Sequence, residues 1–209
     1  MNQHPLFFSV LLIVVCSVGA TAQKNFSTLD EFKNSVGRGE DRITVEATGD
    51  LNGDNLEDWA AVVHREKSDA SPTYQLYVLI RQPQGGYQVA QTSREEEIPG
   101  MGCCWVEDLQ ISLGSIYIQN NAKTAATMEA ARHQFKLYKG QWRLVGIQIF
   151  YTDHSDDTST DTDMNVLTGD VIEKKSKGDG KPKIIKRKKK FGLYLLKDFD
   201  FSNSFGTSV

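Results

Sequence analysis

Short apolar segments recur along the chain, and residues typical of turns separate them. Ile43, Val45 and Ala47 alternate with polar residues, whereas the segment 74–82 is apolar on both faces. Alternation with a period of two is typical of a half-buried strand, and a run that is apolar on both faces is typical of a central strand. The sequence therefore predicts a mainly β fold, an antiparallel meander that forms a sandwich or an open barrel.

Turn residues predict where this meander reverses. Segment 83–86 should return the central strand into 87–92, and Lys139-Gly140 should close another hairpin. Gly114-Ser115 predicts a two-residue turn of type II′. We expect the final segment, 191–201, to be a last strand with an apolar anchor.

One short helix is expected near the N-terminus. Thr28 and Glu31 have the spacing of a capping box, in which each side chain accepts a backbone N–H at the start of a helix. Leu29, Phe32 and Val36 would then share one face. The sequence predicts a helix that ends at about Val36.

Oxygen-bearing side chains are regularly spaced in the run 49–58. Asp50, Asn52, Asp54 and Asp58 occupy the first, third, fifth and ninth positions of one loop, and Leu56 offers a backbone carbonyl at the seventh. Ca²⁺ prefers oxygen ligands from such a loop, and the ion would offset the repulsion between the carboxylates. The sequence predicts a calcium site; the alternative is an Asx-rich turn that holds no metal.

This run differs from a helix-loop-helix calcium loop at two positions. Asn55 replaces the usual glycine, which is tolerable because Asn adopts the left-handed backbone, and Ala61 replaces the closing glutamate. The apolar residues 59–63 that follow predict a strand. The run therefore resembles the FG-GAP or VCBS type of calcium loop, whose ninth-position aspartate leads into a strand. One clear copy argues against a propeller.

A series of further motifs resembles a family of uncharacterised bacterial secreted or periplasmic proteins. After the calcium loop come Phe135-x-Leu137-Tyr138, Trp142-x-Leu144-Val145-Gly146, the run 165–169, a lysine-rich strand and the closing run 196–200. The resemblance implies export and a calcium loop. It implies no substrate.

The first 22 residues are typical of a secretory signal. They contain no Lys, Arg, Asp or Glu, residues 6–15 are almost entirely apolar, and Ala20-Thr21-Ala22 precedes Gln23. Cleavage after Ala22 would leave 209 − 22 = 187 residues, 23–209, as a single β-rich domain. We expect a periplasmic or extracellular location and no transmembrane segment in the mature chain. A lipid anchor at Cys16 is disfavoured, because Val15 precedes it.

The mature chain would keep only Cys103 and Cys104. Neighbouring cysteines cannot link distant parts of a fold. A redox-sensitive vicinal disulfide and a soft-metal site are functional interpretations. One buried thiol beside an exposed one, or pairing with another chain, is the structural alternative.

The segment 173–190 is strongly basic. It holds ten Lys or Arg, at 174, 175, 177, 181, 183 and 186–190, against Glu173 and Asp179, a net of 10 − 2 = +8. The remaining chain then carries −3 − 8 = −11. Lys186, Arg187, Lys188, Lys189 and Lys190 are candidate ligands for lipopolysaccharide or an acidic glycan.

Two considerations limit this polyanion hypothesis. Ile184 and Ile185 could instead lie on the sheet, with the lysines protecting an exposed edge strand from pairing with other chains. No aromatic residue interleaves the lysines, which disfavours nucleic acid as the partner.

The segment 152–163 holds five aspartates among Ser and Thr, and we expect a solvated loop. A second ion site at 153–163 is the alternative, although the ligand spacing is irregular.

The sequence contains no Gly-x-Ser-x-Gly elbow and no His-Glu-x-x-His run. His64 and His133 fall in expected strands, as structural histidines do. We therefore expect a non-enzymatic module that binds an envelope or extracellular ligand, with a hydrolase of no recognisable motif as the alternative.

Overall fold

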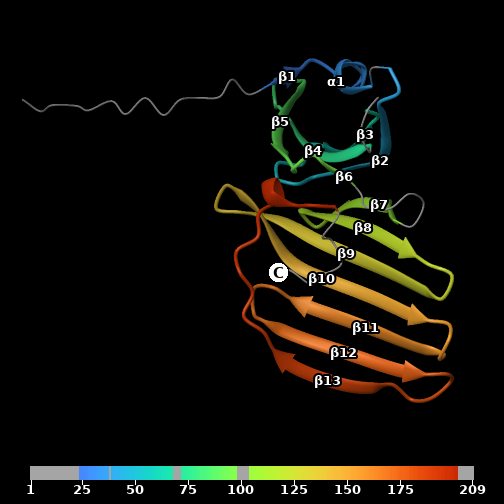
Figure 1. Ribbon diagram of the computed structural model, residues 1–209. Coiled ribbons are helices and arrows are strands. Elements are labelled where there is room, and N and C mark those ends of the chain that lie inside the picture. Colours follow the sequence, from blue (N-terminus) through green and yellow to red (C-terminus); the bar gives the residue numbers. More distant parts are fainter. Residues whose placement is uncertain (1–23, 38, 68–71, 98–103, 202–209) are drawn as a thin grey trace, which may run out of the picture.

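The computed structural model describes residues 24–37, 39–67, 72–97 and 104–201 (Figure 1). Within these ranges the fold is mainly β, with two antiparallel sheets in a sandwich-like arrangement and one α-helix. This confirms the expected fold class. The expected signal segment 1–22 and Cys103 lie outside the described residues.

The first sheet has six strands in the order β1-β5-β4-β3-β2, with β6 paired to β4. Its central strands β3 and β4 coincide closely with the two apolar runs seen in the sequence. The bounds are β1 Asn25–Phe26, β2 Arg42–Gly49, β3 Asp58–Arg65, β4 Thr73–Arg81, β5 Tyr87–Thr92 and β6 Glu96–Glu97.

The second sheet is a seven-stranded meander in which each strand pairs with the next along the chain. In Figure 1 it extends well below the first sheet. Its bounds are β7 Cys104–Ser112, β8 Ser115–Lys123, β9 Thr127–Tyr138, β10 Gln141–Asp153, β11 Thr158–Asn165, β12 Asp170–Lys177 and β13 Lys183–Lys188.

Helix α1, Leu29–Val36, begins as its capping residues predict. The Thr28 Oγ1 accepts a hydrogen bond from the Glu31 N–H at 3.1 Å, and the Glu31 carboxylate accepts one from the Ser27 N–H at 2.6 Å. Phe32 and Val36 are buried against one face of the first sheet. This confirms the predicted helix and its apolar face.

The first sheet is the middle of three layers. Strand β3 is buried on both faces: Trp59, Ala61 and Val63 belong to the apolar cluster beneath α1, whereas Ala60 and Val62 belong to the cluster shared with the second sheet. This double burial explains why the sequence of β3 shows no alternation of apolar and polar residues.

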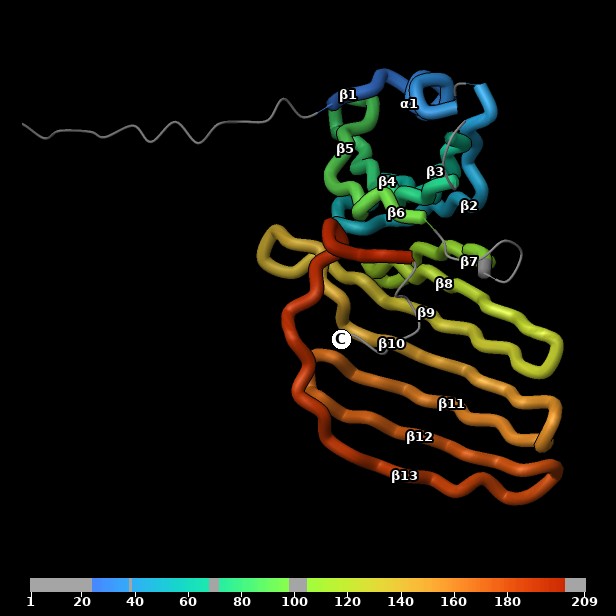
Figure 2. Tube along the Cα trace, viewed as in Figure 1, coloured from blue at the N-terminus to red at the C-terminus, as the bar shows by residue number. Residues whose placement is uncertain are grey.

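The end of the described chain fills the space between the layers (Figure 2). Phe199 and Phe201 are each 1% exposed, and Phe199 makes edge-to-face contacts with Phe135 and Phe201 at 5.2 and 5.0 Å. The prediction of a last strand was wrong, because this segment forms one isolated bridge and the short 3₁₀ helix η1, Leu196–Asp198. The predicted apolar anchor is confirmed.

Two further expectations are corrected. The turn between β7 and β8 consists of Leu113 and Gly114, with φ of +50° and +68°, rather than Gly114-Ser115. Positive φ at both residues is the type I′ pattern and not type II′.

The segment 152–163 is not an open loop. Strand β10 continues to Asp153, and β11 begins at Thr158, because β-branched threonines alternate with the polar residues and both neighbouring strands offer pairing partners.

Replacing Phe199 tests the role of this C-terminal anchor. Phe199→Ala should lower the free energy of unfolding by about 3–5 kcal/mol, because it leaves a cavity between the layers. Phe150→Ala is the control, since Phe150 is 44% exposed. Urea denaturation of residues 23–209 gives both values, and equal losses would contradict the account of the core.

Candidate functional site

The predicted calcium loop joins β2 to β3 at the point where the first sheet meets the second. Leu51 inserts into the core shared by the two sheets and is 3% exposed. A Cβ atom on Gly49 would lie 2.6 Å from the Ile111 side chain of β7, so only glycine permits this approach of the strands. The loop is therefore fixed to both sheets.

Within the loop, side-chain oxygens accept successive backbone N–H groups. Asp50 accepts from Gly53 at 2.7 Å through Oδ1 and from Asn55 at 2.9 Å through Oδ2. Asn52 accepts from Asp54 at 3.0 Å, and Asp54 accepts from Leu56 at 2.8 Å. The hydrogen bond from Asn55 is the largest cause of the lowered pKa of Asp50. Asn55 has φ of +64°, the left-handed conformation expected at this position.

Asp58 occupies a different environment from the other carboxylates. It is 0% exposed, and its two oxygens accept hydrogen bonds from Leu51 N–H at 2.8 Å and Arg81 N–H at 2.9 Å. Burial raises the pKa of Asp58 despite these two bonds, which act in the opposite direction. Asp58 thus connects the start of the loop to the end of β4 from inside the fold.

The loop borders a cleft of about 550 Å³. Asp50, Asn52 and Gly53 line one side, and the β7–β8 turn, with Leu113, lines the other. Lys136 of β9 also lines this cleft. Leu51, whose side chain is buried, also borders this cleft, so the loop meets solvent here.

The donor chemistry of the loop fits Ca²⁺, but its side chains do not converge. Each carboxylate oxygen has two lone pairs, so a hydrogen bond from the backbone leaves capacity for a cation. Asp50, Asn52, Asp54 and Asp58, with the Leu56 carbonyl, would supply the ligands. However, among the described residues no three His, Cys, Asp or Glu side chains are arranged to hold a metal ion. Ion binding would require the loop carboxylates to draw together.

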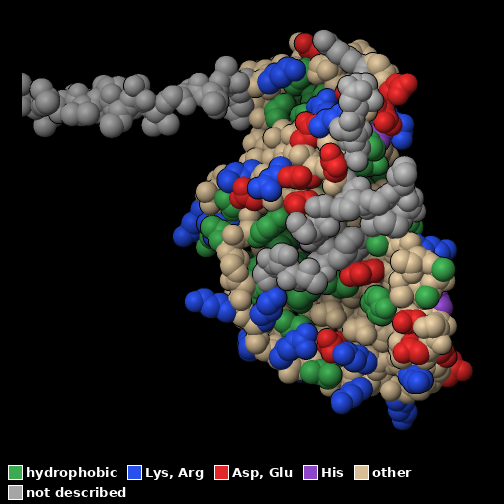
Figure 3. Space-filling model, in the orientation of Figure 1, with side chains coloured by type: hydrophobic (Ala, Val, Ile, Leu, Met, Phe, Trp, Pro, Cys, Tyr) green, Lys and Arg blue, Asp and Glu red, His purple; other side chains and the backbone are tan. Residues whose placement is uncertain are grey.

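The lysine-rich segment forms the β12–β13 hairpin, and β13 is an edge strand of the seven-stranded sheet. Ile184 and Ile185 lie on this edge strand, and Ile184 is 56% exposed. Lys186, Arg187 and Lys188 belong to β13, and Lys189 and Lys190 follow it directly; all five are exposed. Figure 3 shows Lys and Arg side chains gathered along this lower edge of the molecule.

Several of these cations are already paired. The Arg187 guanidinium lies 3.2 Å from the carboxylate of the buried Glu173, and Lys188 lies 2.7 Å from that of Asp170. Lys188 and Thr168 both donate to Asp170 and lower its pKa. Within the described ranges Lys186, Lys189 and Lys190 form no ion pair.

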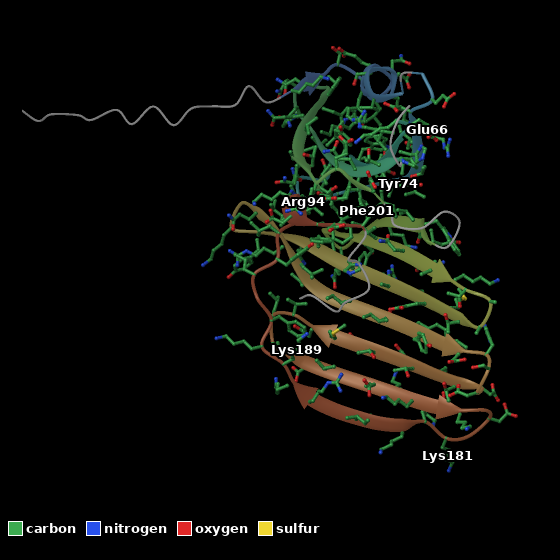
Figure 4. The ribbon with its side chains drawn as sticks, viewed as in Figure 1. Glu66, Tyr74, Arg94, Lys181, Lys189 and Phe201 are labelled. Carbon is green, nitrogen blue, oxygen red and sulfur yellow. The ribbon has the colours of Figure 1, made fainter. Side chains whose placement is uncertain are left out.

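Two of the described histidines, His64 and His133, lie inside the fold, whereas His154 is exposed in the β10–β11 turn. His64 is 3% exposed in β3, with its Nε2 3.4 Å from Glu66 and its ring 4.9 Å from that of Tyr74. Figure 4 labels Glu66 and Tyr74 in the upper part of the molecule. His133 is also 3% exposed, and its ring lies 5.2 Å from that of Phe199. Both histidines thus pack against aromatic rings.

Sequence reasoning missed one feature of the second sheet. Four large apolar side chains at one end of it are exposed, Leu113, Tyr138, Leu167 and Leu193. An apolar residue at a tight turn was the available signal, since Leu113-Gly114 replaces the Asn-Gly that a type I′ turn favours.

Comparison of the chain with protein-family models, with curated proteins and with solved structures found no match. Within the described residues no helix is long and apolar enough to cross a membrane.

Asp58 offers a test of the loop that does not depend on any metal. Asp58→Asn places an NH₂ group against one of two buried N–H donors, so it should lower the free energy of unfolding by about 1–3 kcal/mol. The exposed neighbour Glu57 provides the control, Glu57→Gln. Denaturation in excess chelator measures the free energy of unfolding of both variants. An unchanged value for Asp58→Asn would show that these hydrogen bonds do not stabilise the fold.

Proposed function

We propose that this protein is an exported, non-enzymatic binding or interaction module whose loop 50–58 binds Ca²⁺, with the ion acting mainly as a structural element. Asp50, Asn52, Asp54 and Asp58 would bind the ion through side-chain oxygens, and Leu56 through its carbonyl. The ligand of the module is an envelope or extracellular molecule.

One observation carries the calcium proposal. The Asp50 carboxylate accepts the N–H of Asn55, five residues later, with Asn55 in the left-handed conformation. This bond holds the loop in a tight ring and turns the carboxylates of Asp50 and Asp54 toward the same short stretch of backbone. The loop thus carries oxygen ligands with net negative charge on one short segment, and a hard cation such as Ca²⁺ would offset their repulsion as they draw together around it.

The position of the loop gives the ion a structural role. Leu51 lies in the core between the sheets, and Gly49 packs on β7. An ion that ordered the loop would therefore also stabilise the contact between the two sheets. Extracellular calcium sites bind at about 10⁻⁴ to 10⁻³ M, so millimolar Ca²⁺ would add about 1 kcal/mol of stability.

Thermal denaturation of residues 23–209 in chelator and across a calcium titration tests the proposal. Millimolar Ca²⁺ should raise the melting temperature by about 2–4 °C, and Mg²⁺ should raise it less, because it loses its water ligands reluctantly.

Asp54→Ala identifies the loop as the origin of the effect. Asp54 is exposed, so the variant should fold in chelator and should lack the calcium-dependent rise. Glu57→Ala removes a carboxylate that is not a proposed ligand and should keep the rise. If parent and Asp54→Ala melt at the same temperature in calcium, the loop binds no structural ion.

A second function is favoured by the unpaired lysines on and directly after the edge strand β13, which we call the basic edge (residues 183–190). Lys186, Lys189 and Lys190 are exposed and form no ion pair within the described part of the chain. Such cations could bind an anionic polymer such as lipopolysaccharide or an acidic glycan.

Retention on heparin tests this second function. Replacing Lys186, Lys189 and Lys190 by Gln should lower the salt concentration at which the protein elutes, because fewer sulfate contacts remain to be screened. The same change at Lys24, Lys67 and Lys123 alters the net charge equally but lies outside the edge. Equal elution of the two triple variants would exclude a specific role for the edge.

A further inference from the structure

One end of the seven-stranded sheet combines exposed apolar side chains with unpaired cations. Successive turns of a meander alternate between its two ends, so the turns β7–β8, β9–β10 and β11–β12 lie at the same end. The chain also leaves β13 there. We name this region the basic–apolar rim and define it as residues 113–114, 138–143, 166–170 and 188–195.

Backbone hydrogen bonds hold the parts of the rim together. The Lys189 N–H donates to the Gly169 carbonyl at 2.8 Å, and the Leu144 N–H donates to the Tyr194 carbonyl at 3.0 Å. Segment 189–195 therefore runs from the β11–β12 turn to β10, as the red tube at the left of Figure 2 shows. This segment includes Leu193, and its two hydrogen bonds join the β11–β12 turn to the start of β10.

The rim exposes four large apolar side chains. Leu113 is 87% exposed, Leu167 69%, Leu193 64% and Tyr138 52%. Single exposed leucines are ordinary on soluble proteins, but several gathered at one end of a sheet indicate an interaction site. Leu113 also has φ of +50°, a conformation that is unfavourable for leucine. The type I′ turn accounts for this positive φ, but no described residue covers the Leu113 side chain.

Cations predominate in the three rim segments that carry Tyr138, Leu167 and Leu193. Segments 138–143, 166–170 and 188–195 contain five Lys or Arg and a single carboxylate, Asp170, a net of 5 − 1 = +4. Asp170 is paired with Lys188. Lys139, Arg143, Lys189 and Lys190 form no ion pair with any described residue. Lys139 and Arg143 instead lie 5.5 and 5.0 Å from the centre of the Tyr138 ring.

Two places show the apolar and basic groups side by side. Leu167 and Lys188–Lys190 line one cleft of about 340 Å³, and the Lys189 ammonium lies 5.1 Å from the centre of the Phe191 ring. At the β9–β10 turn, Tyr138 has Lys139 beside it. A soluble polyanion complements only the cations, whereas a lipid surface offers phosphates to the cations and acyl chains to the leucines.

We propose that the basic–apolar rim docks the protein on an anionic lipid membrane, with Leu113, Leu167, Leu193 and Tyr138 entering the acyl boundary and the neighbouring Lys and Arg side chains contacting lipid phosphates. This docking does not depend on the calcium proposal. It shares Lys189 and Lys190 with the polyanion function but differs from it in requiring the leucines.

Co-sedimentation of residues 23–209 with vesicles, in chelator, tests the inference. The protein should sediment with vesicles of phosphatidylcholine and phosphatidylglycerol in equal parts and remain in solution with phosphatidylcholine alone. The double variant Leu167→Ser/Leu193→Ser should bind the anionic vesicles about ten-fold more weakly, because acyl contacts are lost. Lys189→Gln/Lys190→Gln should weaken binding through loss of phosphate contacts.

Ile184→Ser/Lys186→Gln is the matched control, because Ile184 is 56% exposed on β13 outside the rim. It should bind the vesicles as the parent does.

Retention on heparin separates the two functions: the leucine variant should elute as the parent does. Melting temperatures confirm that each variant is folded. Absence of binding to anionic vesicles overturns the inference, and so does parental vesicle binding by the leucine variant or an equal loss in the control.

Discussion

The burial of strand β3 on both faces is the constraint on which the rest of the fold depends. The side chains of Trp59, Ala61 and Val63 must be buried from water on one face of the strand, and those of Ala60 and Val62 on the other face. Helix α1 packs on the first of these faces, and the second sheet packs on the other together with Phe199 and Phe201. Asp58 begins this strand, so the loop before it is anchored to the most deeply buried element of the protein.

Local sequence patterns predicted much of this fold, because the signals that they use are local. Alternation located β2, apolar runs located β3 and β4, and the Thr28–Glu31 spacing located α1. Asp50, Asn52, Asp54 and Leu56 were predicted to lie on one loop, and they do, whereas Asp58 begins β3. The left-handed backbone at Asn55 followed from the chemistry of asparagine.

The features that the sequence did not predict depend on partners distant in the chain. Segment 158–163 contains aspartates that suggest a loop, but pairing with β10 and β12 makes it a strand. Segment 191–201 is apolar enough for a strand, yet its rings fill the space between layers instead. The burial of Asp58 and the joining of the rim by Lys189 and Tyr194 likewise require the tertiary fold.

The two proposed sites lie close together in the fold. Leu113 of the rim and Asn52 of the loop line the same cleft, so calcium and a lipid surface would act at neighbouring places. The β7–β8 turn lies between them, and its tight, strained backbone positions Leu113 outward. An ordered loop would therefore also support one part of the rim, although docking needs the other turns as well.

Hydrogen exchange of individual backbone amides, with and without calcium, tests the central claim most directly. If the loop binds a structural ion, millimolar Ca²⁺ should slow exchange at Gly53, Asn55 and Leu56, whose N–H groups are bonded to the loop side chains. Amides of the β12–β13 hairpin, distant from the loop, should exchange at an unchanged rate. Equal exchange of the loop amides in chelator and in calcium would contradict the account and leave the loop as a turn held by its own hydrogen bonds.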